Sequence, residues 1–312
     1  MAILVKDPGL ATTVQDLGRF GYAHLGISPS GAADELSFRI ANRLVGNADN
    51  AAALEMTLIG GTFSFDAPAV VAVTGAGCPM EVDGSPASDS EAVVVPGGAT
   101  LKCGHLKNGA RAYVAIQGGI DVPLLMGSAS TFMGAQFGGV DGRRLKRGDV
   151  LSVGRVGRAC ARKLRSGVRL SFGIEGETVL RATRGAQQDW FDENAFATLF
   201  TKPFIVSEQS GRTGLRLSGE QLAPKHARQL LTDGIPLGAV QVPADGQPII
   251  LLVDQQTTGG YPKIANVIAA DMHKAGQLRA RDMVRFKEVS IADAIDLLCE
   301  QERRLESIFE SE

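Results

Sequence analysis

Glycine is the feature of this sequence that most restricts its fold. The 312 residues include 38 glycines, and short runs rich in β-branched residues lie between them. Such runs are typical of strands, because β-branched side chains suit a pleated surface and glycine accepts the positive φ of tight turns. In the first half the runs are "AVVAVTGAG" (69–77), "EAVVVPGGATLKCG" (91–104), "RAYVAIQGGI" (111–120) and "GDVLSVG" (148–154). The chain is therefore predicted to be mainly β.

The second half continues in the same way after a basic connector, "RVGRACARKLRSG" (155–167), which is short of apolar residues. Further strands are predicted in "VRLSFGIEG" (168–176), "PFIVSEQ" (203–209), "GLRLSGEQL" (214–222), "GAVQVP" (238–243) and "QPIILLVD" (247–254). We therefore predict an N-terminal β domain over residues 1–166, a C-terminal β domain over 167–290, and a helix with a tail over 291–312.

Helices are predicted to be fewer than strands. An amphipathic helix begins at Asp34 and ends near Gly46, and two more are predicted within 189–200 and 263–276. A last helix begins at Ser290 with a Ser-x-x-Asp start, and its charged end, 300–312, is expected to fray. Because strands and helices do not alternate regularly, a doubly wound sheet is disfavoured, and two β-barrel or sandwich units with a few helices are favoured.

Composition excludes several classes of partner. The 32 basic and 34 acidic residues give a net charge of -2 with no strong segregation, so neither nucleic acid nor a membrane is an expected partner. The apolar start of "MAILVKDPGLATT" is too short for a signal peptide, and a cytoplasmic protein is expected. The four cysteines and four histidines lack metal-ligand spacing, so no protein-bound metal is expected. Phosphate-loop, dinucleotide-binding and nucleophile-elbow motifs are also absent.

The first polar segment is "TTVQDLGRFGY" (12–22), in which Gln15, Asp16 and Arg19 surround a glycine turn. An amide, a carboxylate and a guanidinium this close together can tie the turn internally or face a polar ligand. Both interpretations stay open.

The next segment, "GISPSGAAD" (26–34), leads into the first predicted helix. Ser30 and its neighbours Ser28 and Gly31 direct backbone N–H groups to a place where an anion could bind, and ordinary helix capping explains the same residues. Further along, "GGIDVPLLMGSAST" (118–131) ends in a small hydroxyl cluster that a surface loop explains equally well.

Two arginines mark the second half. Arg212 and Arg216 lie four residues apart in "SEQSGRTGLRLSG" (207–219). If this segment were one strand, both side chains would share a face and could converge on a carboxylate or phosphate. Solvated edge arginines are the alternative.

The most unusual segment, "GAVQVPADGQPIILLVDQQTTGGYP" (238–262), combines a predicted hairpin with a polar loop after Asp254. Two threonine hydroxyls precede two glycines that allow close backbone approach, and a proline follows the tyrosine. A merely connecting loop would not need so many polar groups, so we favour a binding role. The predicted binding residues here are Gln241, Gln256, Thr257, Thr258, Gly259, Gly260 and Tyr261.

Taken in order, these motifs resemble one known family. They include "TTVQDLGRFGY", "GISPSGAADELSFRIANRLVGN", "LEMTLIGGTFSF", "YVAIQGGIDVP", "GSAST", "GAVQVPADGQPIILLVDQQTTGGYP" and "ADMHKAGQL". The chain is identified from them as a member of the biotin-dependent carboxyltransferase and allophanate hydrolase subunit 2 family, over about Asp7 to Ala294. The resemblance implies that the two β domains are cyclophilin-like β-barrels.

Within this family a free-standing chain of such length most resembles one component of the bacterial ATP-dependent 5-oxoprolinase. That enzyme converts 5-oxo-L-proline, ATP and water to L-glutamate, ADP and phosphate. A lactam is a stable amide, so its opening benefits from phosphorylation of its oxygen. The resemblance implies a complex with A and B subunits, of which B is homologous to this chain. It also implies an ATP site shared with the partner, possible use of Mg, and no biotin on this chain.

The resemblance also suggests site residues. The expected catalytic residues are Gln15, Asp16, Arg19 and Asp254, and the expected substrate-binding residues add Ser30, Arg212 and Arg216 to the seven named above. Arg19 or Arg212 would bind a carboxylate or phosphate, whereas Asp254, Thr257 and Thr258 would bind the lactam amide or a metal-nucleotide. The two motif groups are expected to form this chain's share of one cavity.

Two departures from the family pattern stand out. Thr213 replaces a methionine beside Arg212, and Arg281 replaces a turn glycine, which is expected to cost little if its φ is negative.

Two other functions compete. One is a carboxyltransferase component of a biotin-dependent urea carboxylase and allophanate system, whose substrate is also an amide. The other is a non-catalytic regulator of a kinase inhibitor, which would show no turnover with any partner.

Overall fold

The computed structural model describes residues 1–89, 91–157, 161–166, 168, 176–225 and 230–310. The chain divides into two compact units. Unit 1 comprises Met1–Arg19, Ser30–Gly173 and Arg304–Glu312, and unit 2 comprises Phe20–Pro29 and Ile174–Arg303. Each unit therefore includes a segment from a distant part of the sequence. The domain boundary predicted at 167 and most of the strand predicted over 168–176 lie outside the described residues.

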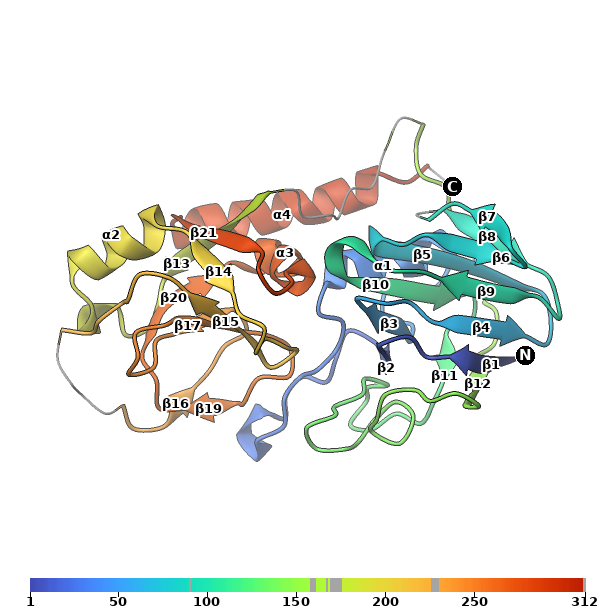
Figure 1. Cartoon of the computed structure of the whole chain (residues 1–312), viewed down its shortest axis with the longest axis horizontal. Coiled ribbons are helices and arrows are strands. Elements are labelled where there is room, and N and C mark those ends of the chain that lie inside the picture. The colour runs from blue at the N-terminus through green and yellow to red at the C-terminus, as the bar shows by residue number, and fades with distance from the viewer. Residues whose placement is uncertain (90, 158–160, 167, 169–175, 226–229, 311–312) are drawn as a thin grey trace. The chain divides into compact units, whose positions relative to one another are not determined.

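Unit 1 contains two antiparallel sheets (Figure 1). One has the order β11-β12-β1-β4-β9-β6-β7 and the other β2-β3-β10-β5-β8. The strands of the first are β1 (Ala2–Asp7), β4 (Thr62–Phe65), β6 (Met80–Val82), β7 (Ser85–Ala87), β9 (Thr100–Cys103), β11 (Ile120–Asp121) and β12 (Val150–Val153). Those of the second are β2 (Ala11–Gln15), β3 (Ala53–Thr57), β5 (Ala69–Gly77), β8 (Ala92–Val95) and β10 (Lys107–Ile116). The mainly-β prediction and the four strand-bearing runs of the first half are confirmed.

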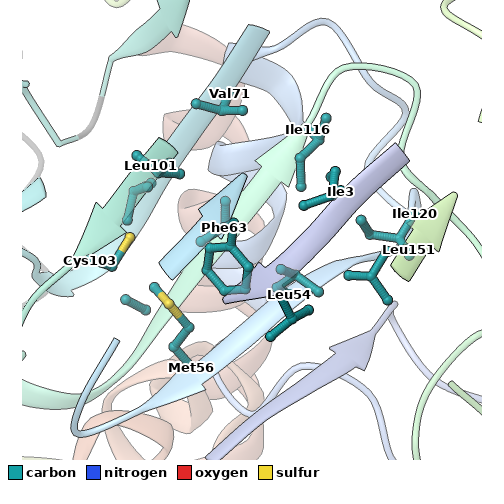
Figure 2. Close-up of a cluster of buried hydrophobic side chains, with 14 of the residues drawn as sticks. Ile3, Leu54, Met56, Phe63, Val71, Leu101, Cys103, Ile116, Ile120 and Leu151 are labelled. Atoms are coloured by element: carbon teal, nitrogen blue, oxygen red, sulfur yellow. The ribbon is translucent and has the colours of Figure 1, made fainter. Parts of the chain in front are cut away.

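The main core of unit 1 lies between these sheets. Figure 2 shows side chains from both sheets turned into this layer, among them Phe63, Leu101 and Leu54. On β3, Leu54 and Met56 belong to this core, whereas Ala53 between β2 and β10 faces the opposite side. The alternation follows from the two-residue period of a strand.

The opposite face of the five-stranded sheet is covered by α1 (Glu35–Leu44). Asp34 caps the helix by accepting a hydrogen bond from the N–H of Ser37 at 2.9 Å, as helix-capping chemistry predicts. The small side chains Ala72 and Ala115 face α1 and let the helix approach the sheet. The central part of β5, Val71–Val73, is accordingly apolar and fully buried on both faces.

The last helix, α4 (Ile291–Ser307), begins as the sequence indicates: Ser290 Oγ donates to Asp293 Oδ2 at 2.7 Å and accepts from the N–H of Asp293 at 3.1 Å. The predicted fraying over 300–312 is wrong for the residues described to Glu310. The helix continues to Ser307, because Leu305 and Phe309 are only 2% and 1% exposed in the apolar cluster of α1 in unit 1. No helix in the described part of the chain is long and apolar enough to span a membrane.

Unit 2 is a closed seven-stranded barrel with the order β13-β20-β17-β18-β15-β14-β21. Its strands are β13 (Glu177–Arg184), β14 (Phe204–Val206), β15 (Gly214–Ser218), β17 (Ala239–Gln241), β18 (Ile249–Leu251), β20 (Lys263–Val267) and β21 (Met283–Glu288). Closure comes from the parallel pairing of β13 with β21. The predicted hairpin between β17 and β18 is confirmed by their antiparallel register. Outside the barrel, β16 (Asp233–Gly234) and β19 (Thr258–Gly259) form a small two-stranded ribbon.

Besides the part of α4 up to Arg303, the helices of unit 2 are short. They are α2 (Glu193–Thr201), α3 (Met272–Gln277) and the 3-10 turns η1 (Ala23–Leu25), η2 (Gln188–Trp190) and η3 (Ala269–Asp271). The prediction within 189–200 is confirmed by α2, which contacts β21. The prediction of a helix over 263–276 is wrong at its start, because Lys263–Val267 forms β20 between β13 and β17. Barrel pairing overrides the helical pattern there, and helix begins only at Ala269.

Arg281, which replaces a turn glycine of the family pattern, does not have the negative φ that the sequence analysis required. Its φ is 75°, in the left-handed region that glycine tolerates and arginine does not favour. The condition under which the substitution was expected to cost little is therefore not met. The side chain is exposed and makes an ion pair with Glu208 at 2.7 Å.

Candidate functional site

Asp16 is the hub of the polar cluster in unit 1. Its Oδ1 accepts hydrogen bonds from the N–H of Gly18 at 2.8 Å, from Ser128 Oγ at 2.7 Å and from Ser130 Oγ. Its Oδ2 accepts from the N–H of Ala129 at 2.7 Å. Four donors on one carboxylate tie the first motif to the "GSAST" segment. The hydroxyl cluster that sequence analysis ranked low is therefore the partner of Asp16.

Arg19 is bound to the same segment. The side chain is 2% exposed, Nη2 donates to the carbonyl of Ser130, and Nε donates to the carbonyl of Leu125 at 3.5 Å. The guanidinium also lies 4.9 Å from the ring centroid of Phe137. Beside it, a Cβ on Gly138 would lie only 2.1 Å from the Ser130 carbonyl oxygen, which explains a glycine there.

Gln15 and Ser30 carry buried polar atoms that lack partners among the described residues: Gln15 Oε1 and Ser30 Oγ. Gln15 is fully buried and uses its amide nitrogen to donate to Thr13 Oγ1 at 2.9 Å and to the carbonyl of Thr131 at 3.2 Å. Ser30 is 2% exposed and has a φ of 56°. An unsatisfied buried group costs about 1–3 kcal/mol, and such groups are typical of places that receive water or a ligand.

A buried network that sequence analysis missed supports the segment after Ser30. Glu55 Oε2 accepts from the N–H of Ala33 at 2.9 Å and from the hydroxyl of Tyr113 at 2.8 Å, and that hydroxyl accepts from the N–H of Asp34 at 2.8 Å. Arg111 makes an ion pair with Glu55 at 3.7 Å. Burial, followed by the charge of Glu55, raises the pKa of Tyr113 well above its usual value. The available signal was a single carboxylate within the apolar run "ALEMT".

In unit 2, Arg212 and Asp254 bind each other. Arg212 Nε lies 2.8 Å from Asp254 Oδ2 and Nη2 lies 3.2 Å from Oδ1. The two arginines were expected to converge on one ligand only if they lay on one strand. Arg212 instead precedes β15, and Arg216 on that strand is exposed. Ser28 Oγ donates to the carbonyl of Gln255, which anchors the first-half segment Phe20–Pro29 on this loop.

The loop after Asp254 folds over β16. The N–H of Ile235 donates to the carbonyl of Thr257 at 3.0 Å, and Gly259 pairs with Asp233. A Cβ on Gly259 would lie 2.8 Å from Ile235 Cδ1 and 3.3 Å from Gln241 Nε2, so the small residue permits this close packing. The exposed members of the loop are Gln256, Thr258, Gly260 and Tyr261.

Gln241 and Lys263 lie opposite each other on β17 and β20. Lys263, which sequence analysis missed, is a buried lysine: its side chain is 3% exposed, and Nζ lies 2.7 Å from Asp233 Oδ2. The hydrogen bond from Lys263 is the main reason that the pKa of Asp233 lies below its usual value. The only sequence signal was a lysine at the end of the polar loop, next to a strand.

The structure thus groups the predicted residues by unit. Gln15, Asp16, Arg19 and Ser30 belong to unit 1; Arg212, Gln241, Asp254 and the loop to Tyr261 belong to unit 2. The expectation that the two groups form one cavity stays a prediction. Among the described residues, no group of three or more His, Cys, Asp or Glu side chains is placed to hold a metal ion.

Comparisons with known proteins give one family. The family model described as "Carboxyltransferase domain, subdomain A and B" matches residues 25–288. The chain is 40% identical to the C subunit of 5-oxoprolinase from Escherichia coli (strain K12), over 96% of this chain and 95% of that protein. It is 38% identical to the C subunit of 5-oxoprolinase from Haemophilus influenzae, over 97% of this chain and 96% of that protein. The crystal structure of K. lactis urea amidolyase matches 99% of this chain at 33% identity with a TM-score of 0.93, and this chain spans 20% of that one. The chain belongs to the carboxyltransferase domain family and carries its subdomains A and B.

Proposed function

We propose that this chain acts as the C subunit of an ATP-dependent 5-oxoprolinase, together with A and B subunits, of which B is homologous to this chain. The complex would convert 5-oxo-L-proline to L-glutamate with hydrolysis of ATP. The observation that carries this proposal is the match to two bacterial proteins of that name along 95% and 96% of their length.

The geometry supports a division of roles. The exposed and half-exposed groups of Thr257, Thr258 and Gly260 are available to a lactam or to the phosphates of ATP. Asp16, Arg19 and Arg212 have carboxylates or guanidiniums engaged in buried internal contacts, so we assign them positioning roles. The sequence has no phosphate-binding loop of a common type, and the ATP site is therefore proposed to be shared with a partner protein.

The test uses the assembled complex. The chain is co-expressed with its candidate A and B subunits, and 5-oxo-L-proline-dependent release of ADP and formation of L-glutamate are measured. Omission of this chain should abolish both products. The double variant Thr257→Ala/Thr258→Ala should lower kcat/KM at least about tenfold. Thr201→Ala, an exposed threonine at the end of α2, is the matched control. Full activity without this chain contradicts the proposal.

A second candidate is the carboxyltransferase component of a biotin-dependent urea-carboxylating system. The TM-score of 0.93 with K. lactis urea amidolyase favours it. It requires biotin carried on another polypeptide, because no Met-Lys biotinylation segment occurs in this sequence. Supplying urea, bicarbonate, ATP, a biotin carboxylase and a biotinylated carrier in place of 5-oxo-L-proline distinguishes the two: carboxylation of urea that requires this chain supports the second function. A complex that forms but turns over neither substrate supports a regulatory role.

A further inference from the structure

One polar layer of unit 2 is built around Ile235, where the β16–β19 ribbon packs on β17 and β18. Along β17, Val240 belongs to the barrel core, whereas Ala239 belongs to a separate cluster with Ile235 and Leu251. Gln241 is two residues from Ala239 and, by the two-residue period of a strand, shares its outer face. We call Asp233, Gln241, Gln255 and Lys263 the outer polar layer.

Two amide groups in this layer have an atom without a partner among the described residues. Gln241 is 1% exposed, and its Nε2 has no acceptor. Gln255 is 4% exposed; its Nε2 donates to the carbonyl of Ile235 at 3.0 Å, while its Oε1 has no donor. One buried donor and one buried acceptor are therefore unsatisfied in the packing around Ile235. Burying these two atoms is unfavourable unless a bound polar molecule forms hydrogen bonds with them.

Lys263 adds a positive charge beside this amide pair. Its Nζ donates to Asp233 Oδ2 at 2.7 Å, and an ammonium group has three protons to donate. Asp233 is half exposed, whereas the Lys263 side chain is 3% exposed. The ammonium group of Lys263 is thus buried, and Lys263 pairs with Gln241 across β17 and β20. It can donate a hydrogen bond to a second acceptor besides Asp233.

We propose that the outer polar layer recognises a lactam carrying a carboxylate: Gln241 Nε2 donates to the lactam carbonyl, Gln255 Oε1 accepts from the lactam N–H, and Lys263 Nζ binds the carboxylate. A five-membered ring holds the N–H and C=O of its amide on the same side, so one molecule can offer both an acceptor for Gln241 Nε2 and a donor for Gln255 Oε1. The proposal rests on the proposed function, because 5-oxo-L-proline is such a molecule. Urea offers the amide groups but no carboxylate, so Lys263 would favour the lactam acid.

Binding of two probes tests this assignment. The affinities of 5-oxo-L-proline and of 2-pyrrolidinone, the same lactam without the carboxylate, are measured by calorimetry on the full chain alone and in its complex. Gln241→Glu exchanges the donor for an acceptor at constant shape, so the affinity for both probes should fall roughly tenfold. Lys263→Met should weaken 5-oxo-L-proline at least about tenfold and leave 2-pyrrolidinone unchanged.

Matched controls separate recognition from folding. Gln209→Glu changes an exposed glutamine of unit 2, and Lys202→Met removes an exposed lysine that also pairs with a carboxylate, Glu220. Both should keep wild-type affinity. Asp233→Asn guards against a Lys263 variant that fails to fold, because it keeps the ammonium and removes the competing carboxylate. This variant should bind 5-oxo-L-proline more tightly than wild type does and should bind 2-pyrrolidinone with unchanged affinity.

Three results overturn the inference: no measurable binding of 5-oxo-L-proline to wild-type protein, unchanged affinity in a folded Gln241→Glu variant, or weakening of both probes alike by Lys263→Met. Failure of the proposed function is a separate result. If the complex produces glutamate and the variants bind normally, only the inference is lost. If the variants behave as expected and the complex has no turnover, only the proposed function is lost.

Discussion

Arg212 and Asp254 form a buried ion pair with two contacts, at 2.8 and 3.2 Å, and their side chains are 9% and 6% exposed. The N–H of Asp254 also donates to the carbonyl of Arg212 at 3.0 Å. This pair fixes the point at which the polar loop leaves the barrel. Sequence reasoning assigned both residues to a ligand, and the structure shows that they bind each other.

Replacing Arg212 by alanine should destabilise unit 2 by about 3 kcal/mol, because it leaves the Asp254 carboxylate buried without its counter-charge. The change is measured by urea unfolding of the full chain. Arg216→Ala is the matched control, since Arg216 is exposed on the adjoining strand, and it should change the free energy of unfolding by less than about 0.5 kcal/mol. Equal effects of the two variants would show that the ion pair adds no stability.

Gly138→Ala should disrupt the Asp16 cluster. Gly138 has a φ of 73°, and a Cβ there would lie 2.1 Å from the Ser130 carbonyl oxygen. The overlap and the backbone strain together should cost more than about 2 kcal/mol. Gly148→Ala is the control: its φ is 91°, but no atom lies within 4 Å of the new Cβ, so only the strain of about 1 kcal/mol applies. Thermal unfolding compares the two, and similar shifts would contradict close packing at Gly138.

Stability should fall on the acid side because of Asp271. Burial alone raises the pKa of this carboxyl, but hydrogen bonds from Arg181 and Lys274 outweigh burial and hold the pKa below the ordinary 3.8. The contacts are two from the Arg181 guanidinium at 2.7 and 2.8 Å and one from Lys274 at 2.8 Å. A lowered folded-state pKa contributes stability that is present above about pH 4 and is lost as the pH falls through the folded value.

Asp271→Asn should therefore destabilise the chain by on the order of 2 kcal/mol at pH 7, and the difference from wild type should shrink below pH 4. Urea unfolding at pH values from 7 down to 3 measures this convergence. Asp189→Asn changes an exposed aspartate of unit 2, and its free energy of unfolding should vary with pH in the same way as that of wild type. A constant difference across the range would rule out the proposed protonation linkage.

Arg281→Gly should stabilise the protein by about 1 kcal/mol, because it relieves a φ of 75° at a non-glycine residue. The lost ion pair with Glu208 joins two side chains that are 83% and 69% exposed, and such pairs contribute little. Arg281→Ala separates the two effects: it removes the ion pair, keeps the strain, and should not stabilise. The thermal midpoints of the three proteins decide between them.

Local patterns of the sequence were enough for much of the fold. The run from Ala69 to Gly77 is β5, the cap at Asp34 begins α1, and Ser290 with Asp293 begins α4. Each depends on residues within one turn or one strand. The helix predicted over 263–276 was wrong in its first residues, because Ile264 and Val267 pack in a barrel core that no local pattern describes.

The candidate site was less predictable. Sequence reasoning selected the segments of Asp16 and Asp254 as candidates from their unusual density of polar and small residues. It could not find Lys263, because a single lysine at a strand start is ordinary until its side chain is buried against Asp233. Nor could it tell that Asp16 is surrounded by the hydroxyl cluster more than one hundred residues later.

The sequence by itself determined where short strands, turns and helix starts lie, because those depend on side-chain branching, glycine conformations and caps within a few residues. Only the tertiary structure decided which strands close the barrel, as in the parallel pairing of β13 with β21, and which charges are buried together. The physical reason is distance along the chain. Pairing energies between remote residues exist only after folding has excluded water and brought the partners into contact.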